Sequence, residues 1–291
     1  MSANVIEEVI FDVEKRVERL LYVPDTDKNL VPFILKPLQR EYLRRAMRPE
    51  SRRRVILKAR QVGMSSVIQA RNYTAAMLTP NMNILVATQD DDTKSIFRAR
   101  ARLHYENLRA VGLGPEKATD NEYEMVFPQL NSRIVFRTAT ESAGRAYTFH
   151  RVHATEVAFW KNAGRSLAGM LESVPETGEM DIESTPSGPY GAFYNLVMST
   201  QGLTMDNDDD VPWELIFYEW WREPRYISTP TPNLFASLTE REEWLMREKG
   251  LSLEQIAFRR AKWAELTALG DDQVLPEREF VEYLETAFVY G

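Results

Sequence analysis

The stretch from Val55 to Ser66 combines residue types that can bind the phosphates of a nucleotide. The apolar run Val55–Leu57 is followed by a polar loop with one glycine, Gly63, and then by two hydroxyl residues. A helix that starts after such a loop offers free backbone N–H groups and a partial positive charge to an anion. The match to the phosphate-loop pattern G-x-x-x-x-G-K-[ST] is partial, because Met64 stands at the lysine position. For this stretch alone, an ordinary strand–turn–helix is an equal alternative.

Lys58, at the front of this loop, is the candidate cation for the phosphates, because a long flexible stem can deliver an ammonium from there. Ser65 is the candidate hydroxyl ligand for Mg²⁺. Gln39, upstream of the loop, is the candidate for binding adenine, because an amide both donates and accepts hydrogen bonds. The residues expected to bind ATP are Gln39, Lys58, Ala59, Arg60, Gln61, Val62, Gly63, Met64, Ser65 and Ser66.

Glu156 is the candidate catalytic base. It stands at the end of the predicted strand Val152–Thr155, and ATPases with phosphate loops place carboxylates at such a strand end. One carboxylate helps to hold Mg²⁺ and another polarises the attacking water. Thr155 stands at the first of these positions, where its hydroxyl is expected to hold Mg²⁺ weakly or through water. A glutamate on the rim of the sheet, without a chemical role, is the alternative for Glu156.

Arg145 and the segment Ser184–Pro186 are candidate functional residues because of where they stand relative to the predicted strands. Arg145, in a loop before the Glu156 strand, suits stabilisation of negative charge on a departing phosphate. Ser184, Thr185 and Pro186 follow another strand, where hydroxyls are expected to sense the γ-phosphate and couple its presence to movement. The alternatives are a surface arginine and a plain turn.

Helices and strands alternate along the chain, which predicts an α/β fold with a parallel, doubly wound sheet flanked by helices. After Trp213 one strand and two helices remain, and Thr239 with Glu242 and Ser252 with Gln255 form capping-box patterns. The predicted strands are Val55–Leu57, Asn83–Thr88, Glu124–Phe127, Arg133–Arg137, Val152–Glu156, Met180–Thr185 and Trp213–Tyr218. Helices are predicted over Val5–Leu21, from Pro37 through Ala46, from the phosphate loop to about Thr79, and over Asp90–Leu108.

The composition is that of a folded globular protein. The 291 residues are 44% hydrophobic, include six tryptophans and carry a net charge of −7. No cysteine is present, which excludes disulfides and thiolate metal sites, and three histidines argue against a His-rich metal site. No apolar run approaches the roughly 20 residues of a membrane helix. Bases gather between Arg40 and Arg60 and between Lys94 and Arg109. A basic face can bind a phosphate backbone even on an acidic protein, although solvated helix faces are the commoner explanation.

In this order, the motifs resemble the ATPase domain of the large terminase subunit of tailed bacteriophages, from about Phe33 onward. Gln39 before Arg60-Gln61-Val62-Gly63 resembles that family's glutamine motif and variant phosphate loop, with Lys58 at the loop's front as in some members. The Val152–Trp160 segment resembles its strand with the catalytic glutamate, and Ser184-Thr185-Pro186 its coupling motif. Thr155 departs from the usual aspartate, which makes Ser65 the safer contact for Mg²⁺.

The resemblance implies an ASCE/RecA-like P-loop NTPase that hydrolyses ATP with Mg²⁺ to move double-stranded DNA into a viral procapsid. It implies sequence-independent DNA contacts, a ring of subunits (five expected, with a monomer as the alternative in isolation), and the portal protein and small terminase subunit as partners. The place of action would be the host cytoplasm, transiently on the procapsid and not in the mature virion. Arg145 is then expected to be an arginine finger that acts on the neighbouring subunit's ATP.

The expected organisation is a helical lead-in over residues 1–32, the ATPase core over 33–211, and the last strand with a helical lid or linker subdomain over 212–291. The family's nuclease domain has no counterpart in this sequence, so no DNA cleavage is expected from it. Two alternatives stay open. One is a helicase or translocase of the DEAD-box-like superfamily, which needs a second RecA-like domain; the other is an inactive P-loop protein that serves as an assembly or DNA-binding module.

Overall fold

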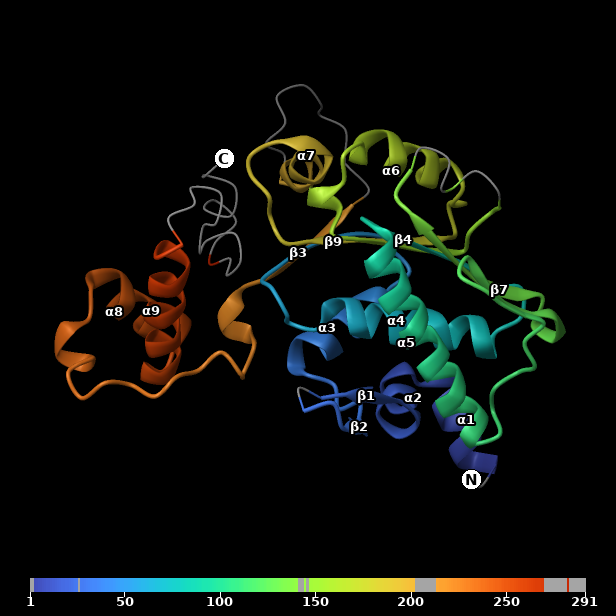
Figure 1. Cartoon of the computed structure of the whole chain (residues 1–291), viewed down its shortest axis with the longest axis horizontal. Coiled ribbons are helices and arrows are strands. Elements are labelled where there is room, and N and C mark those ends of the chain that lie inside the picture. Colours follow the sequence, from blue (N-terminus) through green and yellow to red (C-terminus); the bar gives the residue numbers. More distant parts are fainter. Residues whose placement is uncertain are drawn as a thin grey trace. The chain divides into compact units, whose positions relative to one another are not determined.

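The computed structural model describes residues 3–25, 27–140, 144, 147–201, 213–269 and 282 of the chain (Figure 1). The chain divides into two compact units. The first comprises Met1–Ile56, Gly63–Ser184 and Gly191–Ile216, and the second comprises Leu57–Val62, Thr185–Tyr190 and Phe217–Gly291. The chain therefore passes between the units inside the predicted phosphate loop and again directly after Ser184.

In the described part of the chain, an eight-stranded sheet has the order β10-β3-β9-β8-β4-β7-β6-β5. Strand β4 pairs in parallel with β7 and β8, and β8 pairs in parallel with β9. Strand β6 is antiparallel to both β5 and β7. The α/β prediction with a mostly parallel sheet is thus confirmed, with an antiparallel edge. The strands are β3 Arg53–Lys58, β4 Asn83–Thr88, β5 Thr119–Asp120, β6 Glu124–Phe127, β7 Ser132–Thr138, β8 Arg151–Thr155, β9 Glu179–Ser184 and β10 Glu214–Tyr218.

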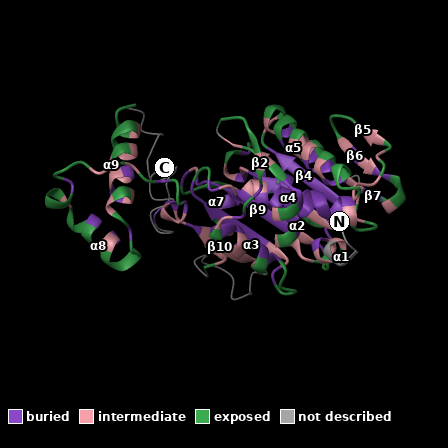
Figure 2. Cartoon of the chain, turned by 90° about the horizontal axis from the view of Figure 1, so that it is seen from below, coloured by how far each residue is buried: buried purple, intermediate pink, exposed green. Residues whose placement is uncertain are grey.

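Helices cover both faces of the sheet in the first unit. Helices α3 (Pro37–Ala46), α4 (Met64–Leu78) and α5 (Asp91–Ala110) lie on one side, and α6 (Ala163–Glu172) and α7 (Gly191–Ser199) lie on the other (Figure 1). Helix α4 contacts α2, α3, α5 and three strands. It is buried almost all round, and Figure 2 shows buried residues throughout the central strands and along α4. The core therefore holds the helix that begins at the phosphate loop in a fixed position. No helix in the described ranges is both long enough and apolar enough to cross a membrane.

The single helix predicted over Val5–Leu21 is wrong. The structure has two helices, α1 (Ala3–Phe11) and α2 (Val13–Leu20), interrupted at Asp12. Asp12 has extended backbone angles, and its carboxylate accepts a hydrogen bond from the Lys15 N–H at 3.1 Å, as an N-cap does. A new helix therefore starts after Asp12, because the preference of aspartate for the N-cap position outweighs the apolar periodicity that continues across it. An unpredicted antiparallel pair, β1 (Tyr22–Pro24) with β2 (Leu30–Pro32), follows.

The second unit contains α8 (Glu240–Lys249) and α9 (Leu253–Thr267). Both predicted capping boxes are confirmed, at Thr239 with Glu242 and at Ser252 with Gln255. The rings of Tyr226 and Phe258 stack with centroids 4.7 Å apart. This unit therefore has an aromatic core of its own. The sequence Glu282–Phe288 also resembles the segment that closes the ATPase region in large terminases, and all of these residues except Glu282 lie outside the described residues.

The basic stretch between Arg40 and Arg60 forms internal ion pairs in large part. Arg40 contacts Glu14 at 2.7 Å, and Arg45 contacts Glu214 at 2.8 Å. Arg54, fully buried, contacts Asp181 at 2.5 Å and Glu179 at 2.8 Å. These arginines join α3 and β3 to α2, β9 and β10.

Glu179 is the centre of the largest of these ion networks. Its Oε2 accepts from Arg54 and from Arg71 (2.6 Å), and its Oε1 accepts from Arg151 (3.1 Å). Burial raises the pKa of this carboxyl, but the three arginines outweigh burial and lower the pKa from about 4.5 to about 2. The unfolded state therefore binds the proton more readily. The resulting stabilisation is fully present above about pH 4.5 and is lost as the pH falls toward about 2.

Replacing Glu179 with glutamine is expected to lower the free energy of unfolding by about 3 kcal/mol at neutral pH, because buried arginines lose their shared counterion. The difference from wild type should shrink as the pH falls through the range between the two pKa values. Urea unfolding at neutral and at acidic pH measures both effects. Glu248→Gln, which removes an exposed partner of Arg247, should cost less than about 1 kcal/mol. Equal stability of Glu179→Gln and wild type at neutral pH would contradict the expectation.

Candidate functional site

The front of the phosphate loop, Lys58 to Val62, is held by the segment that follows β10. Lys58 ends β3 and is 5% exposed. The Ala59 N–H donates to the Tyr218 carbonyl at 3.0 Å. The Tyr226 hydroxyl donates to the Arg60 carbonyl, and the Arg225 guanidinium donates to the Gln61 carbonyl at 3.2 Å.

Arg225 and Tyr226 were not predicted as site residues. They lie far downstream in the sequence, and no local pattern links them to the loop. Glu223, itself buried, accepts from the Arg225 Nε at 2.8 Å and so orients this guanidinium. The loop's carbonyl groups are therefore engaged by fixed donors, which restricts the shapes that its front half can adopt.

Gly63 forms the rear of the loop and the N-cap of α4. Its φ of 81° lies in the left-handed region, which only glycine adopts without cost. An added Cβ would lie 2.9 Å from the Gln39 amide nitrogen. Gly63 is thus required both for its backbone angles and for the close approach of Gln39.

The side chain of Gln39 supports this part of the loop through hydrogen bonds. Its Nε2 donates to the Gly63 carbonyl at 2.8 Å, and its Oε1 accepts from the Lys36 N–H at 2.9 Å. The side chain is 2% exposed. The structure therefore brings Gln39 and Gly63 into contact, in an arrangement that supports the loop backbone. Adenine binding by Gln39 stays a prediction.

Met64, Ser65 and Ser66 form the first turn of α4 and face different surroundings. Met64 is 1% exposed and belongs to the core. Ser65 and Ser66 are half-buried. The position that carries lysine in the standard motif therefore points into the protein interior here, whereas hydroxyls remain at the helix N-terminus.

Glu156 follows β8 with a left-handed backbone, at φ 53° and ψ 42°. Such angles are uncommon for a residue with a side chain and cost about 1–3 kcal/mol, a strain found most often at functional sites. Thr155 is paired with Glu183 in the parallel β8–β9 register, so Glu156 and Ser184 leave adjacent strand ends. The Ser184 hydroxyl lies 3.4 Å from a Glu156 carboxylate oxygen and accepts from the Ala158 N–H at 3.2 Å. The structure brings these two predicted residues together.

Glu183 is a buried acid that the sequence analysis missed. It is 0% exposed, and its Oε1 accepts from the Thr155 hydroxyl at 3.0 Å and contacts His153 Nε2 at 2.9 Å. An acid inside a strand that is buried on both faces is the signal that could have found it. Thr155 thus has a structural role, and its weak contact with Mg²⁺ stays a prediction.

The predicted coupling residues are buried. Ser184 and Thr185 are 0% and 6% exposed, and Pro186 is also buried. The chain leaves the first unit after Ser184.

Arg145 lies outside the described residues. The neighbouring Gly144 is described, and a Cβ added there would lie 2.7 Å from the Gly169 carbonyl oxygen in α6. Close packing against α6 therefore fixes the chain one residue before Arg145.

No group of three or more histidine, aspartate and glutamate side chains able to hold a metal ion occurs within the described ranges. The hydroxyl of Ser65 lies at the N-terminus of α4, and its contact with Mg²⁺ stays a prediction; in phosphate-binding sites Mg²⁺ commonly keeps several waters and few protein ligands.

Comparison with known proteins gives no match to any family model and no significant sequence similarity to a curated protein. Solved structures do match. The crystal structure of the HK97 bacteriophage large terminase is similar with a TM-score of 0.63 and 14% sequence identity, over 92% of this chain and 54% of that one. The large terminase ATPase domain of Thermus phage P74-26, as an R139A mutant, is similar with a TM-score of 0.50 and 16% identity, over 88% of this chain and 94% of that one.

The chain spans about half the length of the HK97 terminase and nearly the whole of the P74-26 domain. This chain therefore has the fold of the ATPase domain of phage large terminases.

Proposed function

We propose that the chain is an ATP-hydrolysing motor that moves double-stranded DNA into a viral procapsid. The observation that carries the proposal is Glu156, held in a strained left-handed conformation where β8 ends, beside the Ser184 hydroxyl. Backbone strain of this kind is found most often at functional sites. The likeness in fold to large terminases supports the same assignment.

In this proposal the loop and α4 bind the phosphates of ATP. The Lys58 ammonium neutralises the β- and γ-phosphates, and the backbone N–H groups at the start of α4 add their partial positive charge. Ser65 contributes a hydroxyl to Mg²⁺, which when bound neutralises charge on the phosphate oxygens. The Glu156 carboxylate orients the attacking water and accepts its proton. Arg145 stabilises the charge of the departing phosphate on a neighbouring subunit's ATP.

Further parts of the proposal concern assembly. The motor works as a ring, expected to have five subunits, docked on the portal in the host cytoplasm with the small terminase subunit as a second partner. Contacts with DNA are made to backbone phosphates, since a packaging motor must accept any sequence. Ser184, Thr185 and Pro186 pass the nucleotide state to the second unit, because the chain crosses between the units there.

ATP turnover with and without double-stranded DNA tests the proposal. We expect hydrolysis that requires Mg²⁺ and rises when duplex DNA is added at a protein concentration that favours assembly. Absence of turnover under these conditions would refute the motor and favour an inactive DNA-binding or assembly module. Stimulation by single strands with unwinding of a forked duplex would favour the helicase alternative.

The substitution Gln39→Glu tests whether Gln39 supports the phosphate loop or recognises adenine. Glutamate keeps the acceptor for the Lys36 N–H but replaces the donor to the Gly63 carbonyl with a repelling carboxylate. We expect KM for ATP to rise about tenfold, from loss of a hydrogen bond next to the phosphates, and KM for GTP to rise by the same factor. Steady-state kinetics with both nucleotides measure this, with the exposed Gln129→Glu as a control. A loss confined to ATP would instead assign adenine recognition to Gln39.

A further inference from the structure

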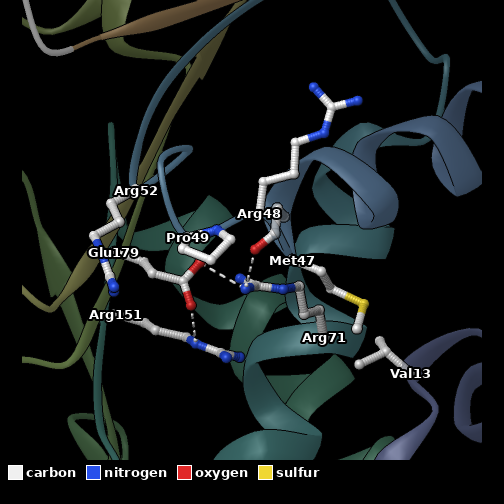
Figure 3. Close-up of a pocket in the computed structure, with 9 residues that line it drawn as sticks. Val13, Met47, Arg48, Pro49, Arg52, Arg71, Arg151 and Glu179 are labelled. Carbon is white, nitrogen blue, oxygen red and sulfur yellow. Dashed lines mark hydrogen bonds and ion pairs between the residues drawn. The ribbon is translucent and has the colours of Figure 1, made fainter.

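A cavity of about 350 Å³ lies within the first unit, lined by four arginines and one acid among its residues: Arg48, Arg52, Arg71, Arg151 and Glu179 (Figure 3). Arg151 and Glu179 are the first residues of β8 and β9. Glu156 and Ser184 lie at the opposite, carboxyl ends of the same two strands. The cavity is therefore separate from the candidate ATP site.

The positive charge around this cavity exceeds the negative charge. The one lining carboxylate, Glu179, is already shared by Arg54, Arg71 and Arg151. Arg71 also donates to the Ala46 carbonyl at 2.9 Å, and Arg54 is shared with Asp181. Partly buried cations need anions nearby, because removing charge from water is costly unless it is compensated. The negative charge of Glu179 is therefore already used within the ion network, and the cavity keeps a net positive charge.

Two of the arginines are accessible to solvent. Arg52 donates to the Thr177 carbonyl at 2.8 Å, and the side chain of Arg48 has no carboxylate partner among the described residues. Figure 3 shows Arg71 and Arg151 around Glu179, with Arg52 close by and Arg48 at the rim with its guanidinium turned outward. Arg48 is exposed and Arg52 half-buried, so an incoming anion meets these two first.

The cavity keeps its charge at neutral pH. Burial, together with the nearby charge of Arg71, lowers the pKa of Arg151 to about 10. Arg151 is therefore still a cation at neutral pH, and its Nε–H is directed to Glu179.

We propose that this cavity is a second anion site, which binds a phosphate group carried either by a free phosphate compound or by a nucleic-acid backbone. Guanidinium groups present paired N–H donors that match phosphate oxygens, with geometry and charge that lysine does not reproduce. The volume falls within the roughly 300–1,000 Å³ of small-molecule sites, which is ample for a phosphate or a pyrophosphate. The site does not depend on the ATPase assignment.

Pyrophosphate binding measured by isothermal titration calorimetry, without Mg²⁺ or nucleotide, tests the proposal. The variants are the double substitution Arg48→Gln/Arg52→Gln, Lys58→Ala in the phosphate loop, and Arg247→Gln, which removes one charge from an exposed position on α8. We expect the double variant to weaken one pyrophosphate site about tenfold or more, through loss of hydrogen bonds from charged groups. Lys58→Ala and Arg247→Gln should keep that site.

Pyrophosphate binding that is abolished by Lys58→Ala and unchanged in the double variant would overturn the proposal, because the phosphate loop would then be the one site. Circular dichroism confirms that the double variant is folded. Arg48→Lys/Arg52→Lys, which keeps the charges but loses the forked donors, should recover only part of the affinity. Full recovery would show charge attraction without a built phosphate site and would also count against the proposal.

Competition identifies the source of the phosphate. If a short DNA duplex displaces pyrophosphate from the Lys58→Ala protein, and the double variant loses this duplex binding, the ligand is a nucleic-acid backbone. The affinity should then fall steeply with salt. If the duplex does not displace pyrophosphate, the ligand is a free phosphate compound. Both results support the phosphate site and assign its ligand.

Discussion

Replacing Glu156 with glutamine is expected to lower kcat for ATP hydrolysis by about 10²–10⁴-fold, the usual contribution of a general base. Glutamine keeps the size of the side chain and a hydrogen-bonding oxygen toward Ser184, but it cannot accept the proton of the attacking water. Binding of ATP should change little, because the proposed phosphate contacts come from the loop and from α4. Phosphate release at saturating ATP measures the first effect, and equilibrium binding of a non-hydrolysable ATP analogue measures the second.

The matched control is Glu172→Gln, which changes an exposed glutamate at the end of α6 and should leave kcat unaltered. Normal ATP turnover in Glu156→Gln would show that Glu156 is not the catalytic base. It would not contradict the proposal that the chain is a motor. A parallel loss of analogue binding would instead indicate that the strained turn at Glu156 had collapsed. The thermal unfolding temperature of the variant separates this outcome from a loss of chemistry.

Replacing Lys58 with alanine is expected to lower kcat/KM for ATP by about 10²–10³-fold, the scale found when one fixed charge-stabilising group is removed. Lys58 ends β3 at the front of the loop, whereas the standard lysine position is occupied by Met64, which is 1% exposed in the core. Residue 64 therefore cannot supply a charge to the phosphates. Steady-state kinetics over a range of ATP concentrations measure the change, with thermal unfolding as the test of folding.

The comparison variant at residue 64 is Met64→Leu, which should keep activity within a few-fold because the volume is nearly unchanged. Met64→Ala is unsuitable, since a cavity in this core position would cost about 2–5 kcal/mol and confuse stability with catalysis. If Lys58→Ala hydrolyses ATP normally, the phosphates must receive their positive charge from another residue, and Arg60 in the same loop becomes the next variant.

Local sequence patterns predicted many elements because the forces that form them act over a few residues. Strand β4 lies where the apolar run Asn83–Thr88 predicted it, and α3 spans the predicted Pro37 through Ala46. The capping boxes at Thr239 and Ser252 form because each involves a side chain and a backbone N–H three residues apart. The helix break at Asp12 shows the limit of prediction from apolar periodicity. The apolar pattern is continuous across Asp12, so periodicity alone did not detect the aspartate that caps α2.

The sequence by itself determined the α/β alternation, the loop that precedes α4 and the placement of Glu156 at a strand end. Only the tertiary structure decided which residues far apart in the chain come into contact. Glu183 under Thr155, Tyr226 and Arg225 on the loop carbonyls, and the arginines around Glu179 all come together through strand order and packing. Such contacts join residues far apart in the chain, and the spacing of residue types along a sequence carries no record of which strands become neighbours. The left-handed angles at Glu156 are likewise a property of the folded backbone, fixed by the surrounding packing and not by the glutamate itself.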